Sequence, residues 1–480
     1  MPTYIMHIPR LMSTQHPDNV EMPFFAKQSF FDGDDEIKEA YYVFSHFGIQ
    51  EQMWDFEGKE VDDFVVKKLL SSYPDFFGEC TLGKDVRITP RIPNPTVERE
   101  EAKLLSETLE MIPRSFDYAK KFYGDGADPP IFEVILPMVT CKRELEMVYW
   151  YYRNLIAGKS GMRLPDGSLI GEWLGEFEPE EVSIIPLFED IKTMLSCHQI
   201  VREFADGRFS EMRVFLARSD PALNFGFITA TLAAKIALSN LEELETDVYP
   251  IIGVGCPPFR GFFDPERLTA LKEYPSVQTF TAQSSFKYDY SFETVRRAAE
   301  KVNGKKRRRA DEIDIDAEVL ETLSSEYQRR IPVVADFVNE ISRFIPKRRM
   351  RKLHIGLFGY SKGEKVKLPR AISFCCALYS IGLPPEIIGF SAVNDRIYDS
   401  LCESIPSFEE QMEYVLRFFN RNSLKIIPLE DDVSRLFHFF KPESDHEYIS
   451  LTEKVMEAFS RQNGVQDAIV QAAKHRRFLG

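Results

Sequence analysis

Short runs of apolar, β-branched and aromatic residues alternate along most of the chain with longer stretches of amphipathic helical periodicity. Such alternation predicts βα units whose strands lie parallel in one sheet. We expect strands at 51–56, 86–92, 131–138, 182–188, 212–217, 248–254, 277–282 and 354–360. Strands in this number and spacing predict an α/β fold, specifically a (β/α)8 barrel of the TIM type.

Helical periodicity fills the intervals between the predicted strands. We expect helices at 98–123, 142–157, 190–204, 222–242 and 264–272. In the last of these, Asp264 is a plausible N-cap and Pro265 suits the first helical position. A barrel needs about 250 residues, and the chain has 480. The remainder predicts added helices, including 34–47 and most of the chain after Leu368.

We find no repeat, linker or low-complexity tract that would divide the chain. We therefore expect a single catalytic domain over 1–480, with a barrel core at roughly 51–362. An N-terminal loop at 10–24 precedes this core, and a helical elaboration at roughly 368–480 follows it.

Charged residues recur where the predicted strands end, and a barrel of this kind builds its active site from those ends. Any one of them alone is most simply interpreted as an exposed loop charge. Together they predict a cluster of charges at the mouth of the barrel, the end where its strands finish. The set is Asp55, Glu57, Arg91, Glu133 (inside its strand), Glu189, Asp220, Arg260, Lys287 and Lys362.

Two of these carboxylates follow neighbouring predicted strands. Glu189 ends the run Ile184–Phe188, and Asp220 follows Val214–Ser219. Paired carboxylates on a rigid rim, with water in the other positions, hold Mg²⁺ or Mn²⁺ in proteins. The alternative is that each carboxylate caps the helix that follows it, and spacing alone does not choose between the two.

The candidate cations lie in proline-braced or glycine-rich segments. Arg91 lies within Thr89–Pro95 and Arg260 within Cys256–Gly261, both stiffened by proline, which suits an arginine that grips carboxylate or phosphate. The glycine- and lysine-rich stretch 356–370 is typical of a mobile lid that brings cations over an anion. A solvated surface loop is the alternative reading of that stretch.

The segment Met12–Asn19 places one histidine on a short turn. Proline after His16 favours extended backbone at the histidine, and Asp18-Asn19 favours a turn. Imidazole titrates near neutral pH and serves as acid, base or anion partner. A turn histidine bonded to its neighbours is the simpler reading. Because this loop precedes the first predicted barrel strand, we expect it to fold back over the mouth.

Composition narrows the class of protein. The net charge of −15 argues against general nucleic-acid binding, and no apolar run reaches the length of a membrane span or signal peptide. The seven cysteines include no CxxC pair, which favours reduced thiols in a cytoplasmic protein and no structural zinc. Two basic runs, 305–309 and 347–352, favour solvated loops or a contact between subunits, with an RNA contact as the alternative.

Several strings together resemble the archaeal-type phosphoenolpyruvate carboxylases, nearly end to end. The most specific is Ser13-Thr14-Gln15-His16-Pro17-Asp18-Asn19. Others follow in the expected order: 53–59, 89–95, 185–189, 217–221, 258–261, 283–290, 359–362 and 368–372. The resemblance implies carboxylation of phosphoenolpyruvate by bicarbonate to oxaloacetate and phosphate, with Mg²⁺ or Mn²⁺ and no biotin. It also implies a barrel with many added helices, assembled as a homotetramer.

The resemblance assigns roles residue by residue. His16, Arg260, Arg370 and Lys362 are the implied catalytic residues, and Glu189 and Asp220 the implied metal ligands. Arg91, Lys287, Arg218 and Gln283 are the implied substrate-binding residues. His16 resembles the histidine of the larger enzymes' Thr-Ala-His-Pro motif, and would accept the proton from carboxyphosphate as it breaks down beside a metal-stabilised enolate.

The chain also departs from the larger enzymes of this class. Their His-Gly-Arg-Gly-Gly loop is absent, and Pro-Pro-Phe-Arg-Gly with Arg260 stands in its place. Leu223 aligns with a lysine that follows their metal-binding aspartate, so that cation is missing here. Lys287 is a weak candidate for supplying it instead. Their inhibitory aspartate site has no counterpart that we recognise. Two rival functions remain: another metal-dependent lyase or aldolase of the phosphoenolpyruvate/pyruvate class, and a non-catalytic binding protein.

Overall fold

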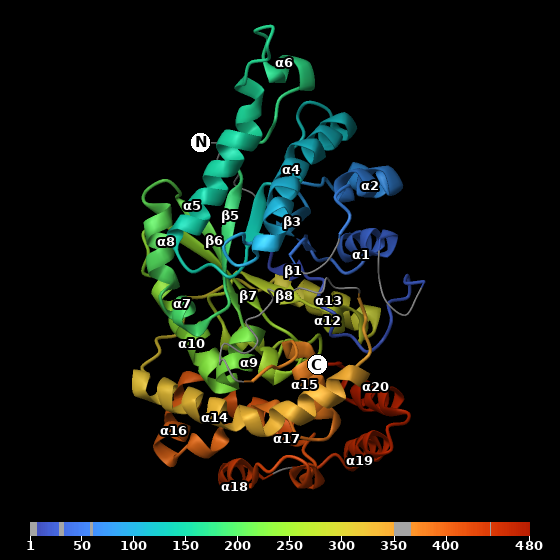
Figure 1. Cartoon of the computed structure of the whole chain (residues 1–480), viewed down its shortest axis with the longest axis vertical. Helices are drawn as coiled ribbons and strands as arrows, with labels where there is room; N and C mark the ends of the chain where they lie inside the picture. The colour runs from blue at the N-terminus through green and yellow to red at the C-terminus, as the bar shows by residue number, and fades with distance from the viewer. Residues whose placement is uncertain (1–6, 28–32, 58–60, 350–365, 442) are drawn as a thin grey trace.

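The protein folds around a closed barrel of eight parallel strands, with helices outside it (Figure 1). The computed structural model describes residues 7–27, 33–57, 61–349, 366–441 and 443–480. Neighbours in the barrel follow chain order from β1 to β8, and β8 closes the ring on β1. The predicted α/β barrel class is therefore confirmed.

The strands are short and buried almost throughout. They are β1 (Leu11–Ser13), β2 (Glu51–Asp55), β3 (Arg87–Arg91), β4 (Glu133–Leu136), β5 (Ser183–Phe188), β6 (Glu211–Ala217), β7 (Asp247–Gly253) and β8 (Thr279–Ala282). Seven of them match the predicted strands to within a few residues.

The predicted strand 51–56 is present as β2, but it is not the first strand of the barrel. The ring is completed by Leu11–Ser13, where Met12 is in register with Glu51 of β2 and with Thr281 of β8. Three residues are too few to produce a readable alternation, so the sequence pattern missed this strand. The predicted strand 354–360 lies outside the described residues and is not among the eight that close the barrel. The barrel therefore runs from Leu11 to Ala282, rather than over 51–362.

Helices lie between the barrel strands and after β8, and those within 34–47, 98–123, 142–157, 190–204 and 222–242 lie where periodicity placed them. They are α1 (Asp34–Ser45), α2 (Val65–Ser72), α3 (Pro74–Glu79), α4 (Ala102–Tyr123), α5 (Lys142–Tyr151), α6 (Ile170–Leu174), α7 (Ile191–Leu195), α8 (Cys197–Ala205), α9 (Ser219–Phe225), α10 (Phe227–Leu241), α11 (Ala270–Glu273), α12 (Ser284–Tyr288) and α13 (Phe292–Asn303).

The predicted helix 264–272 is wrong, because a helix begins only at Ala270. The Asp264 carboxylate accepts hydrogen bonds from the backbone N–H groups of Glu266 and Arg267, at 2.9 and 2.8 Å. Aspartate offers the backbone such a local turn in competition with a helix.

The C-terminal third is helical, as predicted. It comprises α14 (Ala317–Ile341), α15 (Ala371–Ser380), α16 (Asp395–Ser404), α17 (Phe408–Leu416), α18 (Glu430–Phe439), α19 (His446–Ser460) and α20 (Val465–Arg476), with short 3-10 turns such as η7 (Pro385–Ile387) and η8 (Phe390–Ala392).

These helices lie together across one end of the barrel (Figure 1). Phe259, in the loop that follows β7, donates its backbone N–H to Glu386 of η7 at 2.6 Å. The covered end is therefore the one where the strands finish. Helix α15 is apolar nearly all round and largely buried, as expected of a helix enclosed on all sides. The C-terminal helices consequently roof the mouth of the barrel.

The described residues contain no single helix that is long and apolar enough to cross a membrane. A bent pair, Ala371–Ser380 with Pro385–Ala392, passes the same test on length and composition. All seven cysteines are free thiols, as the sequence predicted.

The barrel interior is layered. Its middle is apolar and consists of Met12, Met53, Ile135, Ile185, Leu187, Phe215, Ala217 and Ile251. Beneath that layer, where the strands begin, Arg213 makes two 2.7 Å bonds to the Glu51 carboxylate and one of 2.9 Å to Glu133. Arg87 adds a 3.2 Å contact to Glu133. Glu133 therefore belongs to this buried ionic layer, and its predicted place at the mouth is wrong.

This ionic layer depends on Arg213. Burial opposes the ionisation of Glu51, but Arg213 outweighs it and holds the Glu51 pKa below its usual value. Replacing a partner of a buried ion pair leaves an uncompensated charge in a medium that solvates it poorly.

We predict that Arg213→Met destabilises the protein by about 3–5 kcal/mol, the usual effect of breaking a buried pair. Chemical denaturation at neutral pH measures the loss. Arg296→Met is the matched control, since its pair with Glu300 is 61% exposed on both sides, and it should change stability by less than about 1 kcal/mol. Equal losses in the two variants would contradict a stabilising ionic layer.

Candidate active site at the mouth of the barrel

Acidic and basic side chains meet at the end of the barrel where the strands finish. Arg91, the last residue of β3, binds Asp55 of β2 through Nε and Nη2, at 2.8 and 2.9 Å. The same Nη2 lies 2.8 Å from Glu57. Burial opposes the charge on Arg91, but Asp55 and Glu57 outweigh it and raise the arginine pKa. Three predicted mouth residues are thus brought together.

The two predicted metal ligands lie next to this cluster. Glu189 follows β5 and Asp220 lies in the first turn of α9, after β6. Burial, followed by the charge of Asp220, raises the pKa of Glu189 to about 8. Burial also raises the pKa of Asp220, against the opposing influence of Arg370 and Arg91. Two half-buried carboxylates therefore repel each other at the mouth.

A divalent cation would relieve this repulsion. Glu189 also accepts a 3.0 Å bond from the backbone N–H of Met138, which fixes the direction of its carboxylate. Carboxylate oxygens are the ligands that Mg²⁺ and Mn²⁺ prefer, and two of them leave positions for water and substrate. The described part of the chain has no group of three or more His, Cys, Asp or Glu placed to hold a metal ion. The pair fits a cation held by two carboxylates.

Arg370 reaches the mouth from the C-terminal helices. It is half-buried, directly precedes α15, and its charge acts on Asp220. Within the described residues, no hydrogen bond or ion pair holds its guanidinium group. Arg370 is therefore placed to receive an anion beside the two carboxylates.

His16 lies at the mouth because β1 ends only three residues before it. The loop lies at the mouth as expected, but it does not fold back from outside the barrel, because it directly follows the barrel strand β1. The Nδ1 atom of His16 lies 2.8 Å from the Thr14 hydroxyl. Thr14 therefore sets the orientation of the imidazole ring.

The histidine loop is fixed by backbone bonds to its surroundings. The N–H of Thr14 donates to Ala282 at 3.0 Å, and that of Ser284 donates to His16 O at 3.3 Å. Further along the loop, Asp289 accepts from the N–H groups of Val20 and Glu21 at 2.8 to 2.9 Å. The loop is thus preorganised by β8 and α12.

Arg260 is brought to the mouth but is occupied by the protein. Its side chain is 1% exposed, and Nη1 lies 3.0 Å from the Asp18 carboxylate. It also donates to Ser219 at 3.0 Å, to the Gly480 carbonyl oxygen, and to Gln283. Gln283 is accordingly a partner of Arg260 in this structure.

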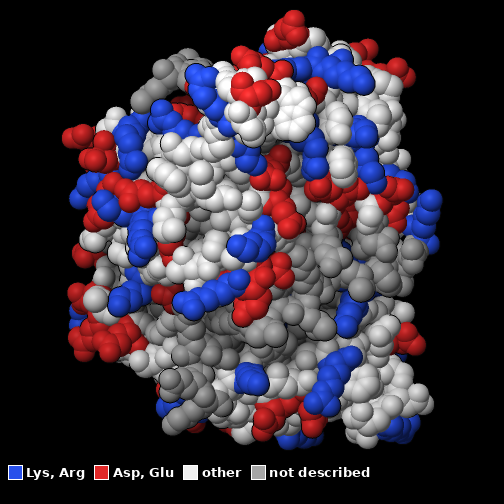
Figure 2. Space-filling model, turned by 45° about the horizontal axis from the view of Figure 1, so that its top comes forward, with Lys and Arg blue, Asp and Glu red and all other residues white. Residues whose placement is uncertain are grey.

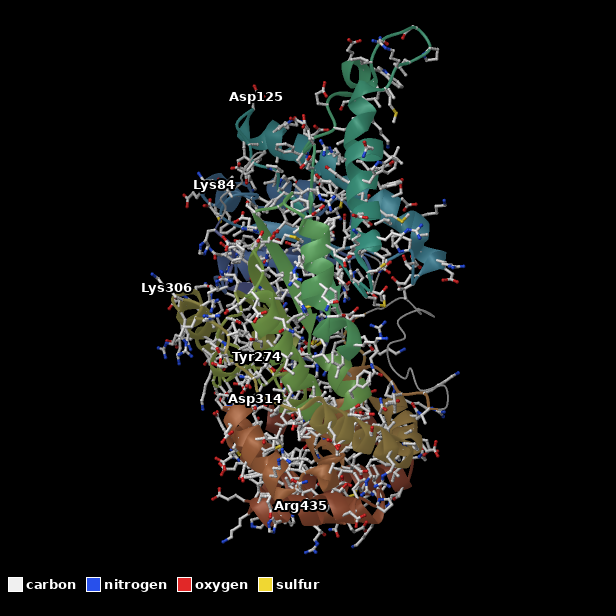
Figure 3. All side chains as sticks on the ribbon, turned by 90° about the vertical axis from the view of Figure 1, so that its left-hand side faces the viewer. Lys84, Asp125, Tyr274, Lys306, Asp314 and Arg435 are labelled. Carbon is white, nitrogen blue, oxygen red and sulfur yellow. The ribbon has the colours of Figure 1, made fainter. Side chains whose placement is uncertain are left out.

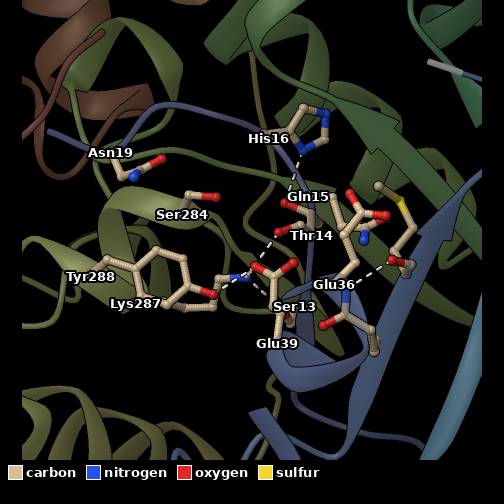
Figure 4. A network of polar contacts seen from close by, with 12 residues as sticks. Ser13, Thr14, Gln15, His16, Asn19, Glu36, Glu39, Ser284, Lys287 and Tyr288 are labelled. Carbon is tan, nitrogen blue, oxygen red and sulfur yellow. Dashed lines mark hydrogen bonds and ion pairs between the residues drawn. The ribbon is translucent and has the colours of Figure 1, made fainter. Parts of the chain in front are cut away.

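Lys287 lies in a separate buried cluster beneath the histidine loop. Its ammonium donates to Ser13 Oγ at 2.8 Å, Thr14 O at 3.0 Å and Glu39 at 2.8 Å. Figure 4 shows the Thr14 side chain between His16 and the Lys287–Glu39 pair. An ammonium has three donors, and all three are used, so Lys287 supports the end of β1.

Arg218 takes no part in the mouth. Arg218 is buried and donates to Tyr274, to Thr231 and to the Phe227 carbonyl oxygen, which places its guanidinium group against α10. Lys362 lies outside the described residues, as does most of the predicted lid.

The basic run 305–309 and the described part of the run 347–352 differ in how far they are exposed to solvent. Lys306 points outward from the flank of the molecule (Figure 3) and is exposed with its neighbours, as predicted. Arg348 and Arg349 are not part of a solvated loop: Arg348 donates to the carbonyl oxygens of Asn19 and Val20, and Arg349 to Glu39. Figure 2 shows both signs of charge interspersed on the face that it presents, rather than one basic field.

Sequence reasoning missed Asp18 and Glu39, the carboxylates that bond Arg260 and Lys287. Asp18 and Glu39 are fully buried and lie on no predicted strand end. Asp18 was visible as part of the most specific string, but Glu39 lies on α1 among ordinary helical residues. Only the folded chain brings Glu39 to Lys287.

The chain matches the protein family described as phosphoenolpyruvate carboxylase over residues 8–480. A relative from Methanothermobacter thermautotrophicus is 48% identical over 487 residues, covering 99% of this chain and 100% of the relative. One from Pyrococcus furiosus is 48% identical over 482 residues, covering 98% and 100%. One from Halobacterium salinarum is 44% identical over 498 residues, covering 99% and 100%. All three are named phosphoenolpyruvate carboxylase.

The Glu39 cluster yields a pH-dependent prediction. Burial opposes the ionisation of Glu39, but Arg349 and Lys287 outweigh it and hold its pKa below the usual value. A carboxylate with a depressed pKa stabilises the fold above its unfolded pKa, about 4.3, and loses that contribution as the pH falls below it. We predict that Glu39→Gln costs about 3–5 kcal/mol at pH 7, and that the gap to the parent protein narrows in acid.

Chemical denaturation at neutral and acidic pH measures this gap. Glu300→Gln, on the surface, is the matched control and should show almost no gap at either pH. A gap for Glu39→Gln that stays constant with pH would refute the assignment of its charge to stability.

Proposed function

The chain belongs to the phosphoenolpyruvate carboxylase family, and on that premise we propose that it joins bicarbonate to phosphoenolpyruvate by way of carboxyphosphate and an enolate. The products are oxaloacetate and phosphate. The observation that supports this proposal most is the arrangement of the mouth, where two half-buried carboxylates and a histidine share one rim with Arg370, which has no bonded partner among the described residues. Each of these groups has a place in the chemistry.

Phosphoenolpyruvate carries a carboxylate and a phosphate, so its site has to supply positive charge. Glu189 and Asp220 would hold a Mg²⁺ or Mn²⁺ ion. When bound, this ion supplies the positive charge that binds the substrate and stabilises the enolate. Biotin has no part in the proposed reaction.

Arg370 would bind the phosphoryl group or the carboxylate of the substrate. It lies beside Asp220 and immediately before α15, whose N-terminal N–H groups favour anions. Arg91 adds a second positive charge at the same rim, although Asp55 and Glu57 already share it. Lys362 remains a predicted contributor. Preorganised charge of this kind is usually the largest part of catalysis by transfer enzymes.

His16 would act in the second half of the reaction. Bicarbonate attacks phosphorus, the bond from phosphorus to the enol oxygen breaks, and carboxyphosphate and enolate are left. Removal of the carboxyl proton of carboxyphosphate by His16 lets it split into CO₂ and phosphate, and the enolate carbon then attacks CO₂. Thr14 orients the ring for this step through its contact with Nδ1.

Enclosure of the mouth would protect the enolate. Water that reaches it delivers a proton and gives pyruvate instead of oxaloacetate. The C-terminal helices lie over the strand ends, and Glu189 and Asp220 are half-buried. Exclusion of water by such a roof favours carboxylation over protonation. Assembly as a homotetramer remains a prediction from the family resemblance, and a cytoplasmic location remains a prediction from the cysteine pattern.

We predict that the purified protein forms oxaloacetate only when bicarbonate is present. Coupling to malate dehydrogenase measures the oxaloacetate, and oxaloacetate formation independent of bicarbonate would favour a different lyase.

In His16→Asn we expect oxaloacetate formation to fall by about 10²–10⁴-fold, the range that a general base contributes. Phosphate release that still requires bicarbonate should persist. Full oxaloacetate formation by His16→Asn would exclude the proposed role of the histidine.

The metal site is tested without relying on activity. We predict that Mn²⁺ raises the melting temperature of the parent protein, because an ion that binds only the folded state stabilises it. In Glu189→Gln and Asp220→Asn this shift should be largely lost. The matched control is Glu133→Gln, at the opposite end of the barrel, which should keep the shift. An unchanged Mn²⁺ response in both mouth variants would remove the metal assignment.

A further inference from the structure

The Arg260 guanidinium group donates most of its hydrogen bonds to other groups of the protein. It donates from Nε to Ser219, from Nη1 to Asp18 and to the Gly480 carbonyl oxygen, and from Nη2 to Gln283. Arginine has five N–H donors, so at most one is left for a ligand. A guanidinium group in this state does not grip a carboxylate or phosphate in the two-pronged manner that makes arginine a strong anion binder.

The loop that carries Arg260 is shaped around this side chain. A Cβ atom on Gly255 would lie 3.0 Å from Arg260 Cζ, so the guanidinium group packs directly on a glycine. Gly261 has φ +113°, and a Cβ there would approach Val254 Cγ1 to 2.5 Å. Glu386 holds the same loop from outside, through its 2.6 Å bond with the Phe259 N–H. The loop therefore admits essentially one place for the guanidinium group.

Three of the four partners of Arg260 come from other strand-end loops, and the fourth, Gly480, lies in the C-terminal segment. Ser219 follows β6 and is adjacent to Asp220. Asp18 follows β1, and its N–H donates to the backbone oxygen of His16 at 3.1 Å. Gln283 directly follows β8. Arg260 itself follows β7, so one guanidinium group ties together four loops of the rim.

Asp18 is equally committed to this arrangement. It is 0% exposed; one carboxylate oxygen faces Arg260, and the other accepts the Ser285 N–H at 2.7 Å. Its backbone oxygen accepts the N–H of Leu479 at 2.8 Å. A change at Asp18 or Arg260 is therefore transmitted to the histidine loop on one side and to the Asp220 loop on the other.

We propose that Arg260 and Asp18 form a positioning pair that fixes His16 relative to Asp220, and that Arg260 is not a substrate ligand. This inference rests on the proposed function, in which His16 and the carboxylate pair act on the same intermediate. Both residues act through others, so neither is a catalytic residue.

The pair matters because two fates compete for the enolate. With the histidine in place, CO₂ forms beside the enolate and the new carbon–carbon bond gives oxaloacetate with one phosphate. With the histidine displaced, CO₂ escapes or forms late, and the enolate takes a proton from water to give pyruvate with one phosphate. Phosphate release is common to both fates, so the ratio of phosphate to oxaloacetate reports the position of His16.

The test compares Arg260→Lys and Asp18→Asn with the parent protein, measuring phosphate, oxaloacetate and pyruvate in the same reaction. We expect oxaloacetate turnover to fall by about 10²-fold, as a displacement of about 1 Å can cause. We also expect the ratio of phosphate to oxaloacetate to rise above one, pyruvate to account for the difference, and the KM for phosphoenolpyruvate to stay nearly constant. Ser219→Ala, which removes a single acceptor, should shift the ratio in the same direction but less.

The matched control is Arg213→Lys, the same change in an equally buried arginine at the other end of the barrel. It should lower stability and leave the ratio at one. A ratio of one in both Arg260→Lys and Asp18→Asn would overturn the inference, as would a large rise in KM with turnover retained, because that is the behaviour of a substrate ligand. If either variant fails to fold, Ser219→Ala decides by the same ratio. Absence of oxaloacetate from the parent protein itself would instead refute the proposed function.

Discussion

The structure depends on closure of the barrel through a strand of three residues. A parallel barrel is complete only when its first and last strands pair, and here Leu11–Ser13 supplies the pairing with both β2 and β8. Because the strand is so short, the residues after it emerge at the mouth at once. The loop with His16 is therefore held by the barrel itself, through backbone bonds to Ala282 and Ser284. A histidine on a free N-terminal arm would have to be fixed by other means, at a larger entropic cost.

Burial of charge explains the division of the barrel into layers. At the end where strands begin, each carboxylate faces an arginine, and the apolar layer of eight residues separates this ionic layer from the mouth. At the mouth, no described residue forms an ion pair with Glu189 or Asp220, and their pKa values are raised by burial and, for Glu189, by its neighbour. Buried charges that are matched by opposite charges support the fold, whereas a pair of like charges without such partners is typical of a functional site. The same physical rule therefore distinguishes the two ends of one barrel.

The sequence predicted the barrel and most of the mouth, for identifiable reasons. Seven strands had readable apolar runs, and strand ends in such a barrel necessarily converge, so Asp55, Arg91, Glu189 and Asp220 were found from position alone. Leu11–Ser13 was missed because three residues carry no periodicity. Glu133 was misplaced because a strand pattern does not state which end of a short strand a residue occupies. The partners of Arg260 and Lys287 were beyond prediction, since Asp18 and Glu39 are separated from them by 242 and 248 residues along the chain.

Two of the cations expected to bind the substrate are bonded to carboxylates of the protein instead, and this affects how the substrate binds. Arg260 and Lys287 were both expected to face the substrate, yet each is neutralised by a buried carboxylate. Within the described part of the mouth, Arg91 is shared by Asp55 and Glu57, which leaves Arg370 as the cation without a fixed partner. One guanidinium group does not balance a substrate that bears both a carboxylate and a phosphate, in the presence of two further carboxylates. In a site with low effective dielectric, the divalent cation that we propose for Glu189 and Asp220 would relieve that imbalance. Under that proposal, affinity for the anion and affinity for the cation are coupled by charge, and each raises the other by the same factor.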